Sequence, residues 1–528
     1  MSRRSVGRLG ELYETPLPDT KNHEGFPAYQ ADLYDSVAEV LLLGTLGKTF
    51  YASAQELAHE AVEVLAAGVA QDPHYVAQAA VLAREEGYVR SAPIVALGLL
   101  TAGNEEAHWH ARAIFGRIIR TADDLRRFVE FVQTGTTGKR FGGLRQRLVR
   151  DWLQLRLDEY QAVKYAEAAN RLSLRNILRM THPVPLNVHS QEIFDWLLHG
   201  TVGETVPMIQ ALSALNQGGA DVTGVVEDSR LPWEAVVPRV EKADATVWRS
   251  LLPGMPYMAL LRSLVTMGRS GVWDDAHALS IACHKLTAPQ AVAKSMLFPF
   301  RYAQAIQVLQ REEAPQELIN AVVRAMEASV SNLPSVGGMK LAIAPDVSPS
   351  MSMENAHVSK DVTAADIAGI FTAALWKANP NAVVLPFSSP LGYRNTSDDG
   401  IHQIHSHPTD SVATIAHEIG KLPGNGTELA APVRWLRTRN IAVDVFVGLT
   451  DSEDWAGGGF LSEWKTYRRV APEAKAVLVQ LTPNRALAAP SNFPGVRYVY
   501  GWSDKVLSFV ADVAAGQSMA DRVRQVTV

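Results

Sequence analysis

The 528-residue sequence contains only one cysteine, Cys283. A single thiol cannot form an intramolecular disulfide framework or a cysteine-built zinc site, and such scarcity is typical of a reducing cytoplasm. Long apolar runs are also missing: the longest, around residues 92–102, is too short to span a bilayer and contains Pro93. The basic residues near the start are not followed by an apolar core, so no secretory signal is expected. We therefore expect a cytoplasmic protein that does not enter a membrane.

Motifs of common hydrolases and nucleotide-binding enzymes are missing as well. The sequence has no Gly-x-Ser-x-Gly elbow and no His-Glu-x-x-His helix. Residues 44–49 read Gly-Thr-Leu-Gly-Lys-Thr, but a phosphate loop needs a glycine where Leu42 stands, and a helical pattern precedes the segment. One polar loop contains His402, His405 and His407, for which a solvated loop is favoured over a zinc site. We predict a protein that is not an enzyme.

Length and composition indicate more than one domain. With 47% hydrophobic and 20% charged residues the chain can fill sizeable cores, and 528 residues exceed what one core usually organises. Residues 1–28 have three prolines and mixed charge, which predicts a tail or arm. Over residues 29–335, apolar residues recur at helical spacing and glycine or proline interrupts every helix or two. This pattern predicts paired short helices in a solenoid or closed ring, with a compact helical bundle as the alternative.

The pattern changes after residues 333–340, where a proline and a glycine pair predict a domain boundary. Apolar strands are predicted at 341–344, 382–387, 441–449, 474–481 and 496–500. Helices are predicted at 364–378, 411–419, 428–437, 460–470 and 503–515. Such alternation predicts an α/β domain over residues 336–528, a doubly wound parallel sheet whose ligand sites lie at the carboxyl ends of the strands.

Three loops of this domain carry short oxygen-bearing side chains. Residues 346–350 read Asp-Val-Ser-Pro-Ser after the first strand, residues 424–427 read Gly-Asn-Gly-Thr, and residues 450–451 read Thr-Asp after another strand. Oxygen ligands of this kind suit a divalent cation, Mg²⁺ in particular, and the pattern resembles the metal-ion-dependent adhesion site of von Willebrand factor type A domains. The predicted ligands are Asp346, Ser348, Ser350, Thr427 and Asp451.

These five ligands leave an open coordination position that a carboxylate or phosphate oxygen of a partner could fill. Strand-end turns and helix caps favour the same residue types and are the alternative interpretation. Pro345 removes a backbone donor directly before the first carboxylate, and we expect it to loosen the site. A hydrolase that uses Asp346 is a weaker alternative, since no general base is evident near the motif.

A basic stretch lies within the predicted helical domain. Residues 112–185 hold fifteen Lys and Arg against seven Asp and Glu, a local excess of +8 in a chain whose formal net charge is -5. This asymmetry and the preference for arginine favour a polyanion-binding face over a solvated face with local ion pairs. In the segment 144–155, Leu144, Leu148, Trp152 and Leu155 are predicted to form the apolar side, while Arg147, Arg150 and Gln154 lie on another side. Candidate contacts are Arg117, Arg120, Lys139, Arg140, Arg150 and Arg179.

Together, the helical region, its basic stretch and the metal motif resemble the Ro autoantigen family, whose helical part is the TROVE domain. The likeness covers roughly residues 25–528 in order. Its clearest segments are 178–183 (Leu-Arg-Met-Thr-His-Pro), 248–256 (Trp-Arg-Ser-Leu-Leu-Pro-Gly-Met-Pro), 346–351 (Asp-Val-Ser-Pro-Ser-Met) and 422–427 (Leu-Pro-Gly-Asn-Gly-Thr). A bacterial member of the family fits best.

The resemblance implies a ring of HEAT-like repeats closed by a type A domain. It also implies a noncatalytic scaffold for small noncoding Y-like RNA and single-stranded ends of misfolded RNA, in RNA quality control with an exoribonuclease. By position, the family pattern implies further RNA contacts at Arg145, Arg147, Lys164, Arg171, Arg175 and His182. Our leading hypothesis is therefore a monomeric RNA-binding scaffold. The alternative is a metal-dependent protein–protein adhesion module that does not bind RNA.

Overall fold

The computed structural model describes most of the chain. The described residues are 17–21, 27–43, 54–138, 140–166, 172–217, 221–240, 243–295, 297, 299–330, 338–352, 363–390, 399–452, 459–482, 486–490, 493–500, 510–512 and 519–528. They form two compact units, residues 1–92 with 330–527 (unit 1) and residues 93–329 (unit 2). No helix in the described part of the chain is both long and apolar enough to cross a membrane.

Unit 1 is built on a parallel five-stranded sheet, as predicted. Its strands lie in the order β4-β3-β5-β6-β8. Their bounds are β3 Leu341–Pro345, β4 Val383–Val384, β5 Val445–Thr450, β6 Lys475–Gln480 and β8 Val496–Tyr500. Every residue of β3 and β5 is buried, which explains why these strands are continuous apolar runs in the sequence.

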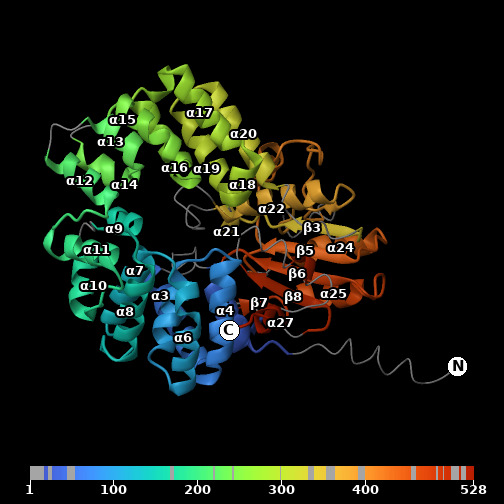
Figure 1. Cartoon of the computed structure of the whole chain (residues 1–528). Helices are drawn as coiled ribbons and strands as arrows, with labels where there is room; N and C mark the ends of the chain where they lie inside the picture. Colours follow the sequence, from blue (N-terminus) through green and yellow to red (C-terminus); the bar gives the residue numbers. More distant parts are fainter. Residues whose placement is uncertain are drawn as a thin grey trace. The chain divides into compact units, whose positions relative to one another are not determined.

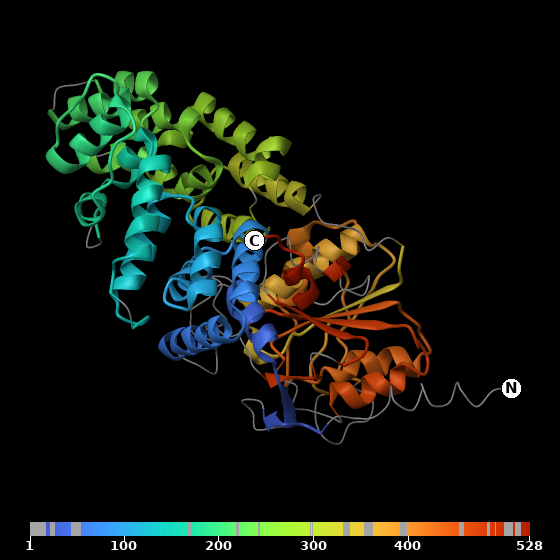
Figure 2. The same cartoon turned by 60° about the horizontal axis from the view of Figure 1, so that its bottom comes forward.

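Helices cover both faces of this sheet (Figures 1 and 2). The pair α22 (Ala364–Ala378) and α23 (Val412–Gly420) packs together, and so does the pair α24 (Ala430–Thr438) and α25 (Phe460–Tyr467). The short α21 (Pro349–Ser352) follows β3. Strand β3 has β4 on one side and β5 on the other, so the order in which the strands are added to the sheet reverses at β3. Such a switch point is where doubly wound sheets place their ligands.

Unit 1 also contains the first helices of the chain, which differs from the predicted domain division. These helices are α2 (Leu33–Leu43), α3 (Ala54–Gln71) and α4 (Pro73–Glu85). The side-chain amide of Gln78 on α4 donates to the carbonyls of Arg524 and Val526, at 2.9 and 2.8 Å, near the C-terminal helix α27 (Met519–Arg524). The predicted arm contributes β1 (Thr20–Lys21) and β2 (Pro27–Gln30), and β2 pairs with β7 (Ala486–Leu487). These contacts join positions about 450 residues apart, which local sequence patterns do not reveal.

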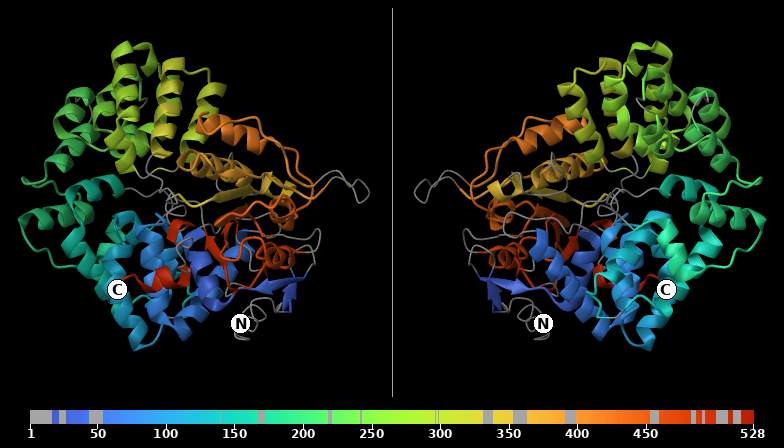
Figure 3. Two further views of the ribbon diagram at one scale, coloured as in Figure 1. Left: turned by 90° about the vertical axis from the view of Figure 1, so that its right-hand side faces the viewer. Right: turned by 90° about the vertical axis from the view of Figure 1, so that its left-hand side faces the viewer.

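The described residues of unit 2 form helices joined by turns and loops, without a strand. Helices that are successive in the sequence are also successive in space (Figure 3). They are α5 (Ser91–Leu100), α6 (Glu105–Ile118), α7 (Ala122–Gln133), α8 (Leu144–Arg156), α9 (Glu159–Tyr165), α10 (Leu174–Thr181), α11 (Val188–His199), α12 (Pro207–Gln217), α13 (Val222–Ser229), α14 (Trp233–Val236), α15 (Ala245–Leu251), α16 (Tyr257–Arg269), α17 (Ala276–Thr287), α18 (Pro289–Ser295), α19 (Pro299–Arg311) and α20 (Gln316–Val330). Side-chain caps fix several starts, including capping boxes at Thr121 and Asn187.

The predicted segments differ from these elements mainly at their ends. The strand predicted at 441–449 begins at Val445, and the strand predicted at 382–387 is regular only over Val383–Val384, with a bridge at Phe387. Most of the helix predicted at 503–515 lies outside the described residues.

Candidate functional site

The first metal-site loop begins where β3 ends, and the sheet stays paired there despite Pro345. Asp346 N donates to Leu449 O at 2.9 Å on one side, and Val347 N donates to Phe387 O at 3.0 Å on the other. Pro345 itself accepts a hydrogen bond from Phe387 N at 3.0 Å. The missing N–H of the proline therefore does not open the backbone at this point.

Three of the five predicted ligands lie together in this loop. Asp346 is fully buried, and its Oδ1 accepts a hydrogen bond from Ser348 N at 2.8 Å. The Oγ atoms of Ser348 and Ser350 are 3.1 Å apart. The alternation of Asp, Ser and Ser along the loop thus places a carboxylate and two hydroxyls in one cluster.

A second loop reaches the first through a very close backbone approach. A Cβ atom on Gly424 would lie 1.6 Å from the carbonyl oxygen of Val347, so any residue other than glycine would force the loops apart. Ser389 N donates to Gly426 O at 2.5 Å and ties the same turn to the segment after Phe387. Thr427, the predicted ligand that follows, is buried. The 424–427 turn is therefore held against the Asp346 loop.

The third loop brings the second carboxylate. Thr450 Oγ1 donates to Asp346 Oδ2 at 2.8 Å, and Asp451 follows directly and is buried. Burial, and after it the negative charge of Asp451, raise the pKa of the Asp346 carboxyl to about 7. Two adjacent buried carboxyls with hydroxyls around them are an oxygen-only donor set that suits Mg²⁺. The residues present therefore fit a divalent cation.

Sequence reasoning missed the residues that support these ligands. Thr450 precedes Asp451 in the sequence motif, but its hydrogen bond to the Asp346 carboxylate was not predicted. Ser452 Oγ lies 3.4 Å from Gln480 Oε1 on β6, and Gln480 Nε2 lies 3.4 Å from Glu39 Oε1 on α2. Neither Gln480 nor Glu39 carries a local signal, because the two are 441 positions apart.

The three histidines of the 401–408 loop have separate partners. His402 Nε2 lies 2.9 Å from Ser388 Oγ, His405 Nδ1 lies 3.2 Å from Glu418 Oε1, and His407 Nδ1 lies 2.8 Å from Thr409 Oγ1. No group of three His, Cys, Asp or Glu able to hold a metal occurs among the described residues. Each of the three side chains therefore has a partner of its own in the described structure.

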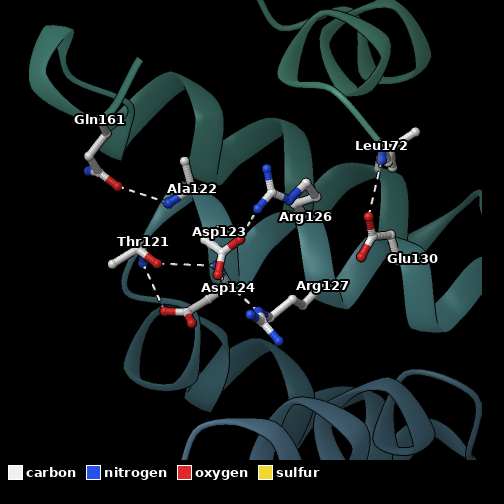
Figure 4. Close-up of polar contacts among 9 residues, drawn as sticks. All are labelled: Thr121, Ala122, Asp123, Asp124, Arg126, Arg127, Glu130, Gln161 and Leu172. Atoms are coloured by element: carbon white, nitrogen blue, oxygen red, sulfur yellow. Dashed lines mark hydrogen bonds and ion pairs between the residues drawn. The ribbon is translucent and has the colours of Figure 1, made fainter. Parts of the chain in front are cut away.

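In unit 2, part of the basic stretch is used inside the helical packing (Figure 4). Asp123 on α7 forms ion pairs with both Arg126 and Arg127, the latter at 2.9 Å. On the same helix, Glu130 Oε1 accepts a hydrogen bond from Leu172 N at 3.1 Å, just before α10. The Glu130–Leu172 hydrogen bond holds α7 to the segment before α10, and the ion pairs of Asp123 lie within α7, where Arg126 is buried.

Arg145 is also a structural residue, which corrects its prediction as an RNA contact. Its side chain is 2% exposed, and its Nε donates to Thr101 Oγ1 at 2.9 Å. One terminal nitrogen donates to Thr137 Oγ1 at 2.8 Å. Burial lowers the pKa of this guanidinium. A side chain enclosed in this way holds α5, α8 and the loop between α7 and α8 together and cannot reach a phosphate at the surface.

Lys164 is committed to an internal contact as well. Its Nζ lies 3.1 Å from Glu234 Oε1 on α14 and within 6 Å of the ring centres of Tyr160 and Tyr165. Burial lowers the pKa of Lys164, but the Glu234 carboxylate and the neighbouring Tyr165 and Tyr160 together more than offset it, so that the pKa is raised overall. This lysine stays charged and holds α9 to α14.

The exposed arginines gather where α8 meets α10. Gln146 Nε2 donates to Met180 O at 2.7 Å, so Arg147 on α8 and Arg179 on α10 lie beside a direct contact between the two helices. Both arginines are exposed. His182 ends α10 in a left-handed conformation (φ 47°) and is exposed too. We call Arg147, Arg179 and His182 the arginine face.

The remaining predicted contacts are spread around this face. Arg120, Arg140 and Arg175 are exposed, whereas Arg117 and Arg150 are half-buried. Arg175 Nε donates to Leu197 O at 2.8 Å, near the end of α11, so part of its hydrogen-bonding capacity is used. Lys139 and Arg171 lie outside the described residues.

The apolar side predicted for α8 is wrong in phase. The buried residues of α8 are Arg145, Val149, Trp152 and Leu153, whereas Leu155 is 73% exposed. Trp152 anchors the buried side, since its Nε1 donates to Ile119 O at 2.8 Å. The prediction failed because it placed Leu155 on the buried side and left Arg145, Val149 and Leu153 out of it.

Comparisons with known proteins agree with this architecture. The Ro60 vWA domain family matches residues 340–514, and the TROVE domain family matches residues 230–363. A Deinococcus radiodurans protein named RNA-binding protein RO60 is 24% identical over 487 residues, which cover 87% of this chain and 86% of the relative. The crystal structure of the Deinococcus radiodurans RO (RSR) protein matches with a TM-score of 0.70 and 21% identity, over 92% of this chain and all of that one.

The fold and these matches define a protein that joins a helical TROVE segment to a von Willebrand factor type A domain. Together the two family matches run over residues 230–514, more than half of the chain. The chain contains a TROVE domain match and a Ro60 vWA domain match, and the resemblance noted in the sequence is confirmed. The TROVE match begins after α8–α10, so the arginine face lies outside it.

Proposed function

We propose that this protein is an RNA-binding scaffold whose contact surface is the arginine face of unit 2. The observation that carries the proposal is that Arg147 and Arg179 are both exposed and directly adjoin, in sequence, the two residues of the Gln146–Met180 hydrogen bond that joins α8 to α10. Planar guanidinium groups match phosphate oxygens and also stack on unpaired bases. The relative named as an RNA-binding protein supports RNA binding itself.

In its finer form, the proposal concerns which RNA is bound. We propose small noncoding RNA of the Y type and single-stranded ends of misfolded RNA, held in RNA quality control together with an exoribonuclease in the cytoplasm. The scaffold acts as a monomer and does no chemistry on the RNA. The TROVE and Ro60 vWA domain matches support these points, and RNA sequencing of what copurifies with the protein from its own cell is the way to identify the ligand.

We further propose that the type A domain binds one Mg²⁺ ion. Asp346, Ser348, Ser350, Thr427 and Asp451 would hold it, directly or through water, and the ion would supply a Lewis-acidic position for a carboxylate or phosphate oxygen of a partner. The close packing of three loops around two buried carboxyls supports this proposal.

The test of RNA binding uses protein freed of nucleic acid and a structured RNA with a single-stranded tail. We expect tight binding at low salt and a steep loss of affinity as salt rises. The variant Arg147→Glu/Arg179→Glu should lose at least tenfold in affinity. Arg311→Glu/Arg469→Glu makes the same change in net charge at two other exposed positions and serves as the control. Equal loss in both variants, or no binding by the unaltered protein, would refute the arginine face as the RNA site.

A further inference from the structure

Next to the arginine face lies a group of exposed aliphatic side chains that RNA binding does not explain. Leu155, Val184, Leu186 and Val188 are 73%, 66%, 61% and 65% exposed. They are four of the seven large hydrophobic residues that stand out as exposed in the described part of the chain. We call these four residues the aliphatic patch. Such clustering is unusual for a surface that only solvent covers.

A hydrogen bond brings the two ends of the patch together. Gln154 Nε2 donates to Val184 O at 2.6 Å, which places the segment after α10 beside the residue that precedes Leu155 on α8. Leu186 and Val188 follow Val184 at alternate positions. Val184, Leu186 and Val188 therefore come from one continuous stretch, and Leu155 comes from the end of α8, against which that stretch lies.

The segment that carries the patch is held in one conformation. Pro183 and Pro185 flank Val184 and fix their own φ angles. Leu186 N and Asn187 N both donate to Ser190 Oγ at 3.0 Å, and Asn187 caps α11. A surface that is already ordered loses little conformational entropy when it binds a partner.

The chemistry of the patch favours a protein over RNA. Unpaired bases stack on aromatic rings and on guanidinium planes, whereas leucine and valine offer them no comparable surface. Aliphatic side chains bind other aliphatic side chains, as in the grooves that accept amphipathic helices. The positive charge beside the patch specifies the partner further: Arg156 adjoins Leu155 and is exposed.

We propose that the aliphatic patch binds an acidic, amphipathic segment of a partner protein. The apolar side of that segment would cover Leu155, Val184, Leu186 and Val188, and its carboxylates would face Arg156. The proposal goes beyond RNA binding and does not depend on it, because the patch side chains differ from those assigned to RNA. A partner docked here would lie next to bound RNA.

The test uses a designed peptide as a defined probe for the full-length protein freed of nucleic acid. The probe is an amphipathic helix of about 18 residues with leucine at helical spacing and glutamate elsewhere. One control peptide has lysine in place of glutamate, and another has the acidic composition in scrambled order. Binding is measured by fluorescence anisotropy at increasing peptide, up to about 1 mM, the weak end of specific affinities.

We expect the acidic amphipathic peptide to bind and both controls to bind at least tenfold more weakly. Leu155→Ser/Val184→Ser should reduce binding tenfold or more, and so should the separate variant Leu186→Ser/Val188→Ser. Circular dichroism shows whether each variant is folded. Leu17→Ser removes an equally exposed leucine in unit 1 and should have no effect.

Three outcomes would overturn the proposal. The acidic amphipathic peptide could fail to bind at any concentration, or it could bind no better than its scrambled and lysine controls. The folded patch variants could also lose RNA affinity as strongly as Arg147→Glu/Arg179→Glu, which would assign the patch to RNA. Failure of RNA binding by the unaltered protein would refute the proposed function but would leave the peptide result standing.

Discussion

The Asp346 carboxyl is buried away from solvent, so the free energy of unfolding that its ionisation costs the folded protein depends on pH. In the metal-free folded protein its pKa is raised from 3.8 to about 7. Between these values the folded state keeps a proton that the unfolded chain has released, so stability falls as pH rises through this window. At pH 8 the full penalty amounts to about 4 kcal/mol, from three pKa units at about 1.4 kcal/mol each.

Asp346→Asn should therefore make the metal-free protein more stable at pH 8, and the gain should shrink as the pH falls toward 4. Denaturant unfolding in the presence of a chelator measures both effects. Added Mg²⁺ should stabilise the unaltered protein and leave the variant unchanged, because a ligand that binds only the folded state raises its stability. Asp399→Asn, at an exposed ion pair with Arg439, is the control. A gain that is the same at every pH would contradict the buried-charge explanation.

Arg145 and Arg147 are two residues apart and should behave in opposite ways. Arg145→Ala removes a buried guanidinium bonded to Thr101 and Thr137, so it should cost about 2–4 kcal/mol of stability. Arg147→Ala removes an exposed side chain and should leave stability within about 0.5 kcal/mol. Only Arg147→Ala should weaken RNA binding at a temperature where both variants are folded. Thermal unfolding and RNA titration of the pair check this.

At the scale of elements, the metal site depends on two loops that touch through a glycine. Gly424→Ala places a methyl group 1.6 Å from Val347 O, so the 424–427 turn must move away from the Asp346 loop. We expect the stabilisation of the protein by Mg²⁺ to disappear, together with about 1–3 kcal/mol of stability. Gly254→Ala, where nothing lies within 4 Å of the added atom, is the control. Retention of the full Mg²⁺ effect in Gly424→Ala would show that Thr427 is not a ligand.

The sequence predicts elements well where local periodicity decides and poorly where distant partners decide. The strands of the sheet are apolar runs because both faces are covered. Because β3 and β5 are parallel, the loops that follow them meet at the same edge of the sheet. The apolar side of α8 was misplaced because a buried arginine and an exposed leucine contradict residue type. The support of Gln480 by Glu39 could not be foreseen either, since a helix at the start of the chain reaches a strand near its end.

At the scale of the whole molecule, the two proposed activities belong to different units. All five predicted metal ligands lie in unit 1, and the arginine face and aliphatic patch lie in unit 2. No proposed ligand or contact is shared between the units. Mutations without shared partners usually act independently, so each activity should survive the loss of the other.

We therefore expect a double dissociation, measured with a single-stranded RNA whose own structure does not depend on Mg²⁺. Asp346→Asn should abolish the Mg²⁺-dependent rise in melting temperature and leave RNA affinity unchanged. Arg147→Ala/Arg179→Ala should leave the Mg²⁺ effect intact. It should also reduce the slope of log affinity against log salt by about 1.4, since each phosphate contact on a single strand contributes about 0.7. If Asp346→Asn changed RNA affinity more than twofold, the metal site and the RNA site would be coupled, and the type A domain would act on RNA binding rather than on a separate partner.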